Sequence, residues 1–303
     1  MQIKPDWSLR VRMLAAMGGM ALLYAAFVGV AAVWANSTVG SGGILVVLAV
    51  AAVLVGLQYR YAPQAALRAL DADRVDEQQY PDLHARVGRL AAQAGVPKPD
   101  IAVAPQSAPN AFATARGRDD AVVAVTEGLL ERVDDDELDA VLAHELAHIE
   151  HRDALVMSLV TFLVTAGALV VRNFWWFGSG GGDGGGGGDG QPWIVGFVAV
   201  AFVAWIGGYL VSRAVSRHRE FAADRGAAAI TGSPGAMASA IDSISEEMAA
   251  TPDDDLRDHA ELNALFVVPA EAKSRLSRMM ATHPDPEKRI ERLADLAGEF
   301  EGR

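Results

Sequence analysis

Two histidines four residues apart, with a glutamate beside the first, form the segment best suited to chemistry: His144-Glu145-Leu146-Ala147-His148. On a helix, side chains at positions i and i+4 lie on one face, so both imidazoles can bind a single metal ion. Glu145 is then placed to take a proton from water at that ion. The neighbouring residues are mainly apolar, which predicts a buried helix, where two histidines without partners would be costly. The alternative is a solvated histidine pair on an exposed helix face.

A second pair of reactive side chains, Glu220 and Asp224, is also spaced by four residues. A hydrolytic zinc site usually takes three protein ligands, and the chain has no cysteine, so the third must be histidine, aspartate or glutamate. We expect Glu220 to be this ligand. We expect Asp224 to accept a hydrogen bond from a ligand imidazole, with His144 the first candidate. Taken alone, this segment better fits a salt-bridged helix face beside a membrane.

Four uncharged apolar runs lie at about 13–35, 43–59, 154–171 and 193–211. The helices that they form must bring these side chains together. A helix rises about 1.5 Å per residue, so runs of about 20 residues can cross a hydrocarbon core of roughly 30 Å. A cleavable signal peptide is the alternative for the first run, but the run is long for one and a second follows almost at once. The last two runs form a hairpin that returns the chain to the same membrane face, so the segment with His144 and His148 can meet the segment with Glu220 and Asp224.

The apolar runs divide the chain into four parts. Residues 1–62 are predicted to form a transmembrane hairpin, 63–153 a catalytic part with the histidine motif, 154–212 a second transmembrane hairpin, and 213–303 a second catalytic part with C-terminal helices. The glycine-rich stretch 178–192 is predicted to be a linker. A calcium-binding repeat would need several copies, each with an apolar residue.

Basic residues lie before the first and third runs and after the second and fourth, whereas the connection 36–42 carries no charge and the stretch 178–192 carries only two aspartates. The positive-inside rule therefore places both termini and the catalytic parts in the cytoplasm, in a multi-pass protein of the plasma membrane. A net charge of −12 argues against a nucleic-acid partner, because phosphate binding needs a basic surface.

Between the second and third runs, the pattern predicts a helix from Pro81 to Gly95 and short strands at 101–104, 111–115 and 121–126. The helix with the histidine motif is expected to begin near Asp134, with Glu137 completing a capping box. No glycine or proline separates this helix from the third apolar run, so we expect the two to be continuous.

Several segments, taken in order, resemble the HtpX family of membrane metalloproteases, in the gluzincin group that also contains the CAAX prenyl endoproteases. They are Asn110-Ala-Phe-Ala-Thr, Val125-Thr-Glu-Gly-Leu-Leu, Ala143-His-Glu-Leu-Ala-His, Ser216-Arg-His-Arg-Glu-Phe-Ala-Ala-Asp, Thr282-His-Pro and Arg289-Ile290. Their order and spacing are specific and cover nearly the whole chain. The resemblance implies a mainly α membrane protein with four transmembrane helices and a zincin-like α+β cytoplasmic catalytic domain carrying a small sheet. It also implies one Zn²⁺ per chain, held by His144, His148 and Glu220, with Glu145 as the catalytic base.

The same resemblance implies that the substrates are polypeptides, above all membrane or misfolded proteins cleaved in stress response and protein quality control. It points to Asn110, Ala111, Phe112 and Ala113 as an edge strand that pairs with substrate; an ordinary sheet edge is the alternative. His283 is the candidate donor to the oxyanion, with His259 the weaker one and a structural role for His283 equally open.

Two other classes of protein remain as alternatives. A site-2-type intramembrane protease carries the same motif inside an apolar span, but here Asp134 to Glu137 and Glu150 to Asp153 flank the motif with charge. A non-proteolytic membrane scaffold or transporter with a structural metal site has no use for Glu145. The sequence does not indicate the oligomeric state or the natural substrate.

Overall fold

The computed structural model describes residues 7–40, 42–172, 192–250 and 285–301. His259, His283 and most of the glycine-rich stretch 178–192 lie outside these residues. The packing of the chain defines two compact units. One contains Trp7–Tyr59 and Val156–Val215, and the other contains Arg60–Leu155 and Ser216–Arg303. The division of the chain at residues 62, 153 and 212 stays a prediction.

Most of the length of four helices, each long and apolar enough to cross a membrane, as predicted, lies in the first unit. They are α1 (Trp7–Val39), α2 (Gly43–Ala69), α6 (Asp153–Arg172) and α8 (Pro192–Thr231). Large apolar side chains on their outer faces are exposed, among them Leu22 at 74% and Leu45 at 68%. Such faces suit a lipid solvent, in which an apolar surface is not penalised.

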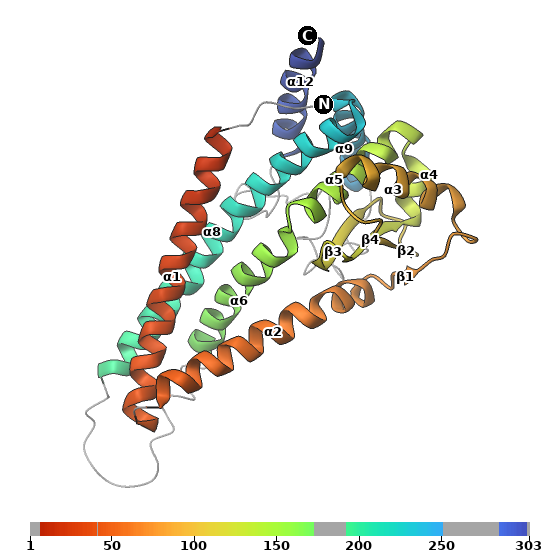
Figure 1. Ribbon diagram of the computed structural model, residues 1–303. Helices are drawn as coiled ribbons and strands as arrows, with labels where there is room; N and C mark the ends of the chain where they lie inside the picture. Colours follow the sequence, from red (N-terminus) through yellow and green to blue (C-terminus); the bar gives the residue numbers. More distant parts are fainter. Residues whose placement is uncertain (1–6, 41, 173–191, 251–284, 302–303) are drawn as a thin grey trace. The chain divides into compact units, whose positions relative to one another are not determined.

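Two of these helices are longer than predicted. α2 continues ten residues past residue 59, through Pro63, and α8 continues to Thr231 instead of ending near residue 211. Ala, Arg and Glu favour helix after residue 211, and no proline or glycine interrupts the chain before Gly226. Glu220 and Asp224 therefore lie on the same unbroken helix as the fourth span (Figure 1).

Within the helical unit, α6 and α8 are in close backbone contact. A Cβ atom at Gly167 would lie 2.8 Å from the carbonyl oxygen of Ala201 and 2.9 Å from the amide nitrogen of Trp205. Met20 of α1, Val160 and Leu163 of α6 and Ala204 of α8 form the buried core. Small residues that let backbones approach are typical of helix packing in membranes.

The second unit contains a four-stranded sheet in the order β1-β2-β4-β3. Its strands are β1 (Asp73–Arg74), β2 (Asp100–Ala104), β3 (Ala111–Gly117) and β4 (Asp120–Thr126). β2 and β4 are parallel and the other pairs are antiparallel. The three predicted strands are confirmed; β1 is too short to show alternation in the sequence. Among the described residues, β3 forms one edge of the sheet.

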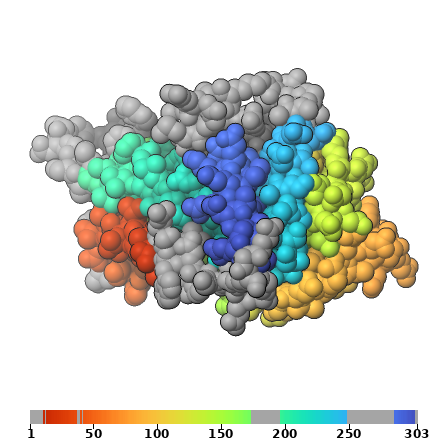
Figure 2. Space-filling view, turned by 90° about the horizontal axis from the view of Figure 1, so that it is seen from above, coloured from red at the N-terminus to blue at the C-terminus, as the bar shows by residue number. Residues whose placement is uncertain are grey.

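The helices of this unit are α3 (Pro81–Ala94), α4 (Glu127–Arg132), α5 (Asp135–Glu150), α9 (Pro234–Ala250) and α12 (Pro286–Glu301). α3 ends at Gly95, whose φ of 68° lies in the left-handed region, as expected for a C-terminal glycine. Asp134 and Glu137 form the predicted capping box at the start of α5. α5 packs against α3, α9 and β3 through a buried apolar core, and α12 lies beside α9 (Figure 2).

The expected continuity between α5 and the third span is wrong. α5 ends at Glu150, α6 begins at Asp153, and Arg152 between them has a φ of 57°. The amides of His151 and Arg152 donate to the carbonyls of Ala147 and Ile149, which closes the last turn of α5. Glycine usually occupies such a left-handed position, so the sequence gives no sign of the break.

Candidate metal centre

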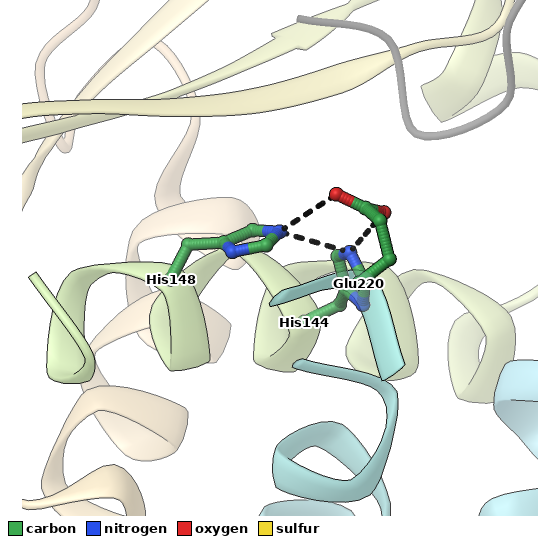
Figure 3. Close-up of side chains that lie close together, drawn as sticks. All are labelled: His144, His148 and Glu220. Atoms are coloured by element: carbon green, nitrogen blue, oxygen red, sulfur yellow. Dashed lines mark hydrogen bonds and ion pairs between the residues drawn. The ribbon is translucent and has the colours of Figure 1, made fainter. Parts of the chain in front are cut away.

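Three side chains from two helices converge on one point (Figure 3). His144 and His148 of α5 lie with their Nε2 atoms 3.2 Å apart. Glu220 of α8 places Oε2 3.6 Å from His144 Nε2 and Oε1 3.7 Å from His148 Nε2. His144 and Glu220 are buried, at 0% and 4% exposure. This is a candidate site for a metal ion.

Small residues allow α5 and α8 to approach closely enough for this convergence. A Cβ atom at Gly226 of α8 would lie 2.6 Å from the Cβ of Ala147, which stands next to His148 on α5. Ala223 and Ala227 of α8 are also completely buried. Ala147 and Gly226 thus set the separation of the two helices, and this separation brings Glu220 within reach of both imidazole rings.

Each imidazole has an aspartate at its other ring nitrogen. His144 Nδ1 lies 3.1 Å from Asp224 Oδ1, and His148 Nδ1 lies 2.6 Å from Asp153 Oδ2. Both aspartates are buried, at 3% exposure. A carboxylate at Nδ1 holds the proton there and leaves the lone pair of Nε2 for a metal. Asp224 was predicted for this position, whereas Asp153 was not.

Arg289 of α12 neutralises the acids of the site. Its Nε and Nη2 donate to the two carboxylate oxygens of Asp224 at 2.9 and 2.7 Å, and its Nη1 lies 3.6 Å from Glu220 Oε2. Arg289 is 1% exposed. The sequence identified this arginine only as part of a family motif, because nothing in a sequence shows which cation will be buried beside which acid. An aligned pair of guanidinium and carboxylate groups is among the strongest contacts that proteins form.

The ring of His144 lies in an environment that favours positive charge. Burial by itself lowers the pKa of His144, but the carboxylates of Asp224 and Glu220 outweigh it and raise the pKa to about 9. With a proton on Nδ1 of each ring, beside its aspartate, the two Nε2 lone pairs would face each other at 3.2 Å. Two lone pairs repel, so a proton or a metal cation must lie between the rings.

The donor set fits zinc. Tetrahedral zinc with bonds of about 2.0–2.2 Å separates its nitrogen and oxygen ligands by roughly 3.3–3.5 Å. The three separations between Nε2 atoms and Glu220 oxygens are 3.2, 3.6 and 3.7 Å. Two imidazoles and one carboxylate are also the ligand types of hydrolytic zinc sites that keep a position open for water.

The remaining predicted site residues are the catalytic base, the substrate strand and the oxyanion donors. Glu145 is buried next to His144, at 3% exposure. Asn110 lies just before β3, and its backbone N–H donates to Thr126 Oγ1 at 2.8 Å. Ala111 and Phe112 are buried in the sheet, and Ala113 is partly buried. α5 packs against β3. The oxyanion candidates His283 and His259 lie outside the described residues.

Four membrane-spanning helices joined to a buried pair of imidazoles and a carboxylate define the class of membrane-bound metallopeptidases. The model of peptidase family M48 matches residues 77–297. A protease HtpX homolog of Moorella thermoacetica is 42% identical over 302 residues, with 100% of this chain and 99% of the relative covered. A protease HtpX homolog 2 of Methanosarcina mazei is 40% identical, with 97% of each chain covered.

The chain belongs to peptidase family M48 and, within it, to the HtpX proteases. It is a membrane metalloprotease of a zinc-dependent family. The crystal structure of S. mikatae Ste24p has the same fold, with a TM-score of 0.50 and 16% identity over 93% of this chain and 67% of that one. A mainly helical membrane protein with a small mixed sheet is therefore confirmed.

Proposed function

We propose that this chain is a zinc endopeptidase that hydrolyses peptide bonds of membrane and misfolded proteins, in protein quality control under stress. The observation that supports this most is the convergence of His144, His148 and Glu220, with Glu145 buried beside the first ligand. The three would hold one Zn²⁺. When bound there, zinc polarises the scissile carbonyl and lowers the pKa of water toward about 7.

The chain's own residues then move the protons. Glu145 accepts a proton from the water that attacks the carbonyl carbon, so a carbon–oxygen bond forms as the water loses that proton. Glu145 later gives the proton to the amide nitrogen as the carbon–nitrogen bond breaks, and the products are a carboxylate and an amine. Asp224 keeps the proton of His144 on Nδ1, and Arg289 keeps Asp224 charged and oriented. His283 is proposed to donate to the oxyanion.

Residues 110–113 are proposed to bind the substrate backbone. β3 is at the edge of the described sheet and packs on α5, the helix of the two histidines. In the close-up, a strand ribbon passes above the three side chains (Figure 3). An extended peptide added to a sheet edge is held by its main chain, so this mode of binding tolerates many sequences. Such tolerance suits an enzyme that removes damaged proteins.

Removal of zinc tests the proposed function. A strong zinc chelator is expected to abolish casein cleavage by the purified full-length protein in detergent, and Zn²⁺ in slight excess is expected to restore it, whereas Mg²⁺ is not, because nitrogen ligands select zinc over magnesium. Metal analysis should give one zinc per chain. The control is a non-chelating isomer of the same compound. Full activity of metal-free protein would contradict the proposal.

The catalytic unit and both termini are proposed to face the cytoplasm, because clusters of basic residues precede the first span and follow the second and fourth. The chain has no cysteine, so single cysteines report on topology without background. In intact cells, a membrane-impermeant maleimide is expected to label Ser179→Cys, between the last two spans. It should label Lys98→Cys, on the catalytic unit, only after permeabilisation. The reverse pattern would overturn this orientation.

A further inference from the structure

The carboxylate of Asp153 contacts the second histidine of the motif and an arginine of α8 at the same time. Its Oδ2 lies 2.6 Å from His148 Nδ1 and 2.9 Å from Arg219 Nε. Asp153 is 3% exposed and the Arg219 side chain 12% exposed. His148 is thus held at Nδ1 by Asp153, while its Nε2 faces Glu220 at 3.7 Å.

This contact exists only because the chain leaves the helical path between α5 and α6. In a continuous helix, His148 and Asp153 would be five residues apart and would point about 140° away from each other. Arg152 adopts a φ of 57°, an unfavourable conformation for a residue with a side chain. Such strain persists where the surroundings fix it, often at functional sites. Here the break turns Asp153 back to the imidazole.

The negative charge of Asp153 is stabilised on two further sides. The residue occupies the first turn of α6, where the helix dipole favours an anion. Arg219 is the neighbour of Glu220 on α8, so its ion pair with Asp153 also ties the helix of the third candidate ligand to the start of α6. The arrangement repeats that at His144, where Asp224 contacts Nδ1 and Arg289 holds Asp224.

We propose that Asp153 is a positioning residue for the metal centre: its carboxylate, fixed by Arg219, accepts a hydrogen bond from Nδ1–H of His148 and so directs the lone pair of Nε2 at the metal. This inference rests on the zinc site proposed above. The break at Arg152 is the backbone device that makes it possible, and each ligand imidazole then has its own pair of aspartate and arginine.

The experiment compares metal binding by three full-length variants in detergent. Asp153→Asn removes the charge at constant size. Asp153→Glu keeps a charge for Arg219 but moves the carboxylate by one methylene group. Asp139→Asn is the matched control, because Asp139 lies on the same helix as the histidines and pairs with Arg86 and Arg89, at 3.2 and 2.5 Å, away from the imidazoles. The readouts are the zinc dissociation constant, by competition with a chelating dye, and the absorption spectrum of the cobalt-substituted protein.

Asp153→Asn is expected to raise the zinc dissociation constant by about 10- to 100-fold and to alter the cobalt spectrum. Loss of a carboxylate that hydrogen-bonds to a metal-binding histidine has effects of this size. Asp153→Glu is expected to raise it as well, whereas a purely structural ion pair with Arg219 would survive this change. Asp139→Asn should bind zinc as wild type does. The proposal is overturned if either Asp153 variant binds zinc with wild-type affinity and spectrum. A wild-type protein that binds no zinc would instead overturn the proposed function.

Discussion

Replacing Glu145 by glutamine is expected to reduce peptide-bond hydrolysis by roughly 10²- to 10⁴-fold, while the protein still binds one zinc ion. Glutamine has nearly the same size and cannot take the proton from the attacking water. The metal is unaffected because the proposed ligands are His144, His148 and Glu220. The measurement is kcat on casein or a quenched fluorescent peptide, together with the zinc content of the same preparation.

The matched control is Glu150→Gln, at the end of the same helix. A substitution away from the site should leave kcat within about twofold of wild type. A Glu145→Gln variant that binds zinc and cleaves as fast as wild type would show that this mechanism of proteolysis is wrong. It would also revive the reading of the site as a structural metal centre in a scaffold or transporter.

Replacing Arg289 by methionine is expected to be the most destabilising of the changes considered, because it leaves the carboxylates of Asp224 and Glu220 buried without the guanidinium that neutralises them. Burial acts to lower the pKa of Arg289, but Asp224 raises it above its ordinary value, so the side chain is charged at every physiological pH. Removing one partner of a buried ion pair costs about 3–5 kcal/mol. In a folded unit of the size of the catalytic unit, this loss of stability lowers the melting temperature by roughly 6–20 °C.

Thermal unfolding of the zinc-free protein in detergent measures this effect, because zinc would itself neutralise the acids. Lys288→Met is the control: it removes an exposed cation one residue earlier on α12 and should change the melting temperature by about 2 °C or less. Adding Asp224→Asn to Arg289→Met should recover part of the loss, since the double variant leaves fewer uncompensated charges. Equal melting temperatures for Arg289→Met and wild type would show that the pair is not stabilising.

The end of α5 is a feature that the sequence predicted wrongly. α5 stops before the third span, although no glycine or proline lies at this boundary. Local propensities describe which conformations a segment prefers. At Arg152 the tertiary contacts of Asp153 override that preference, whereas α8 continues past residue 211, where no glycine or proline occurs before Gly226.

By itself, the sequence determined the features that depend on composition and short spacing: four apolar spans, the pairing of His144 with His148 on one helix face, the capping box of α5 and membership of a protease family. Only the tertiary structure decided which distant side chains complete the site. Asp153 and Arg289 are found by their burial and their distances to His148 and Asp224, because an ion pair in a protein interior depends on where separate helices meet and leaves no periodic signal along the chain.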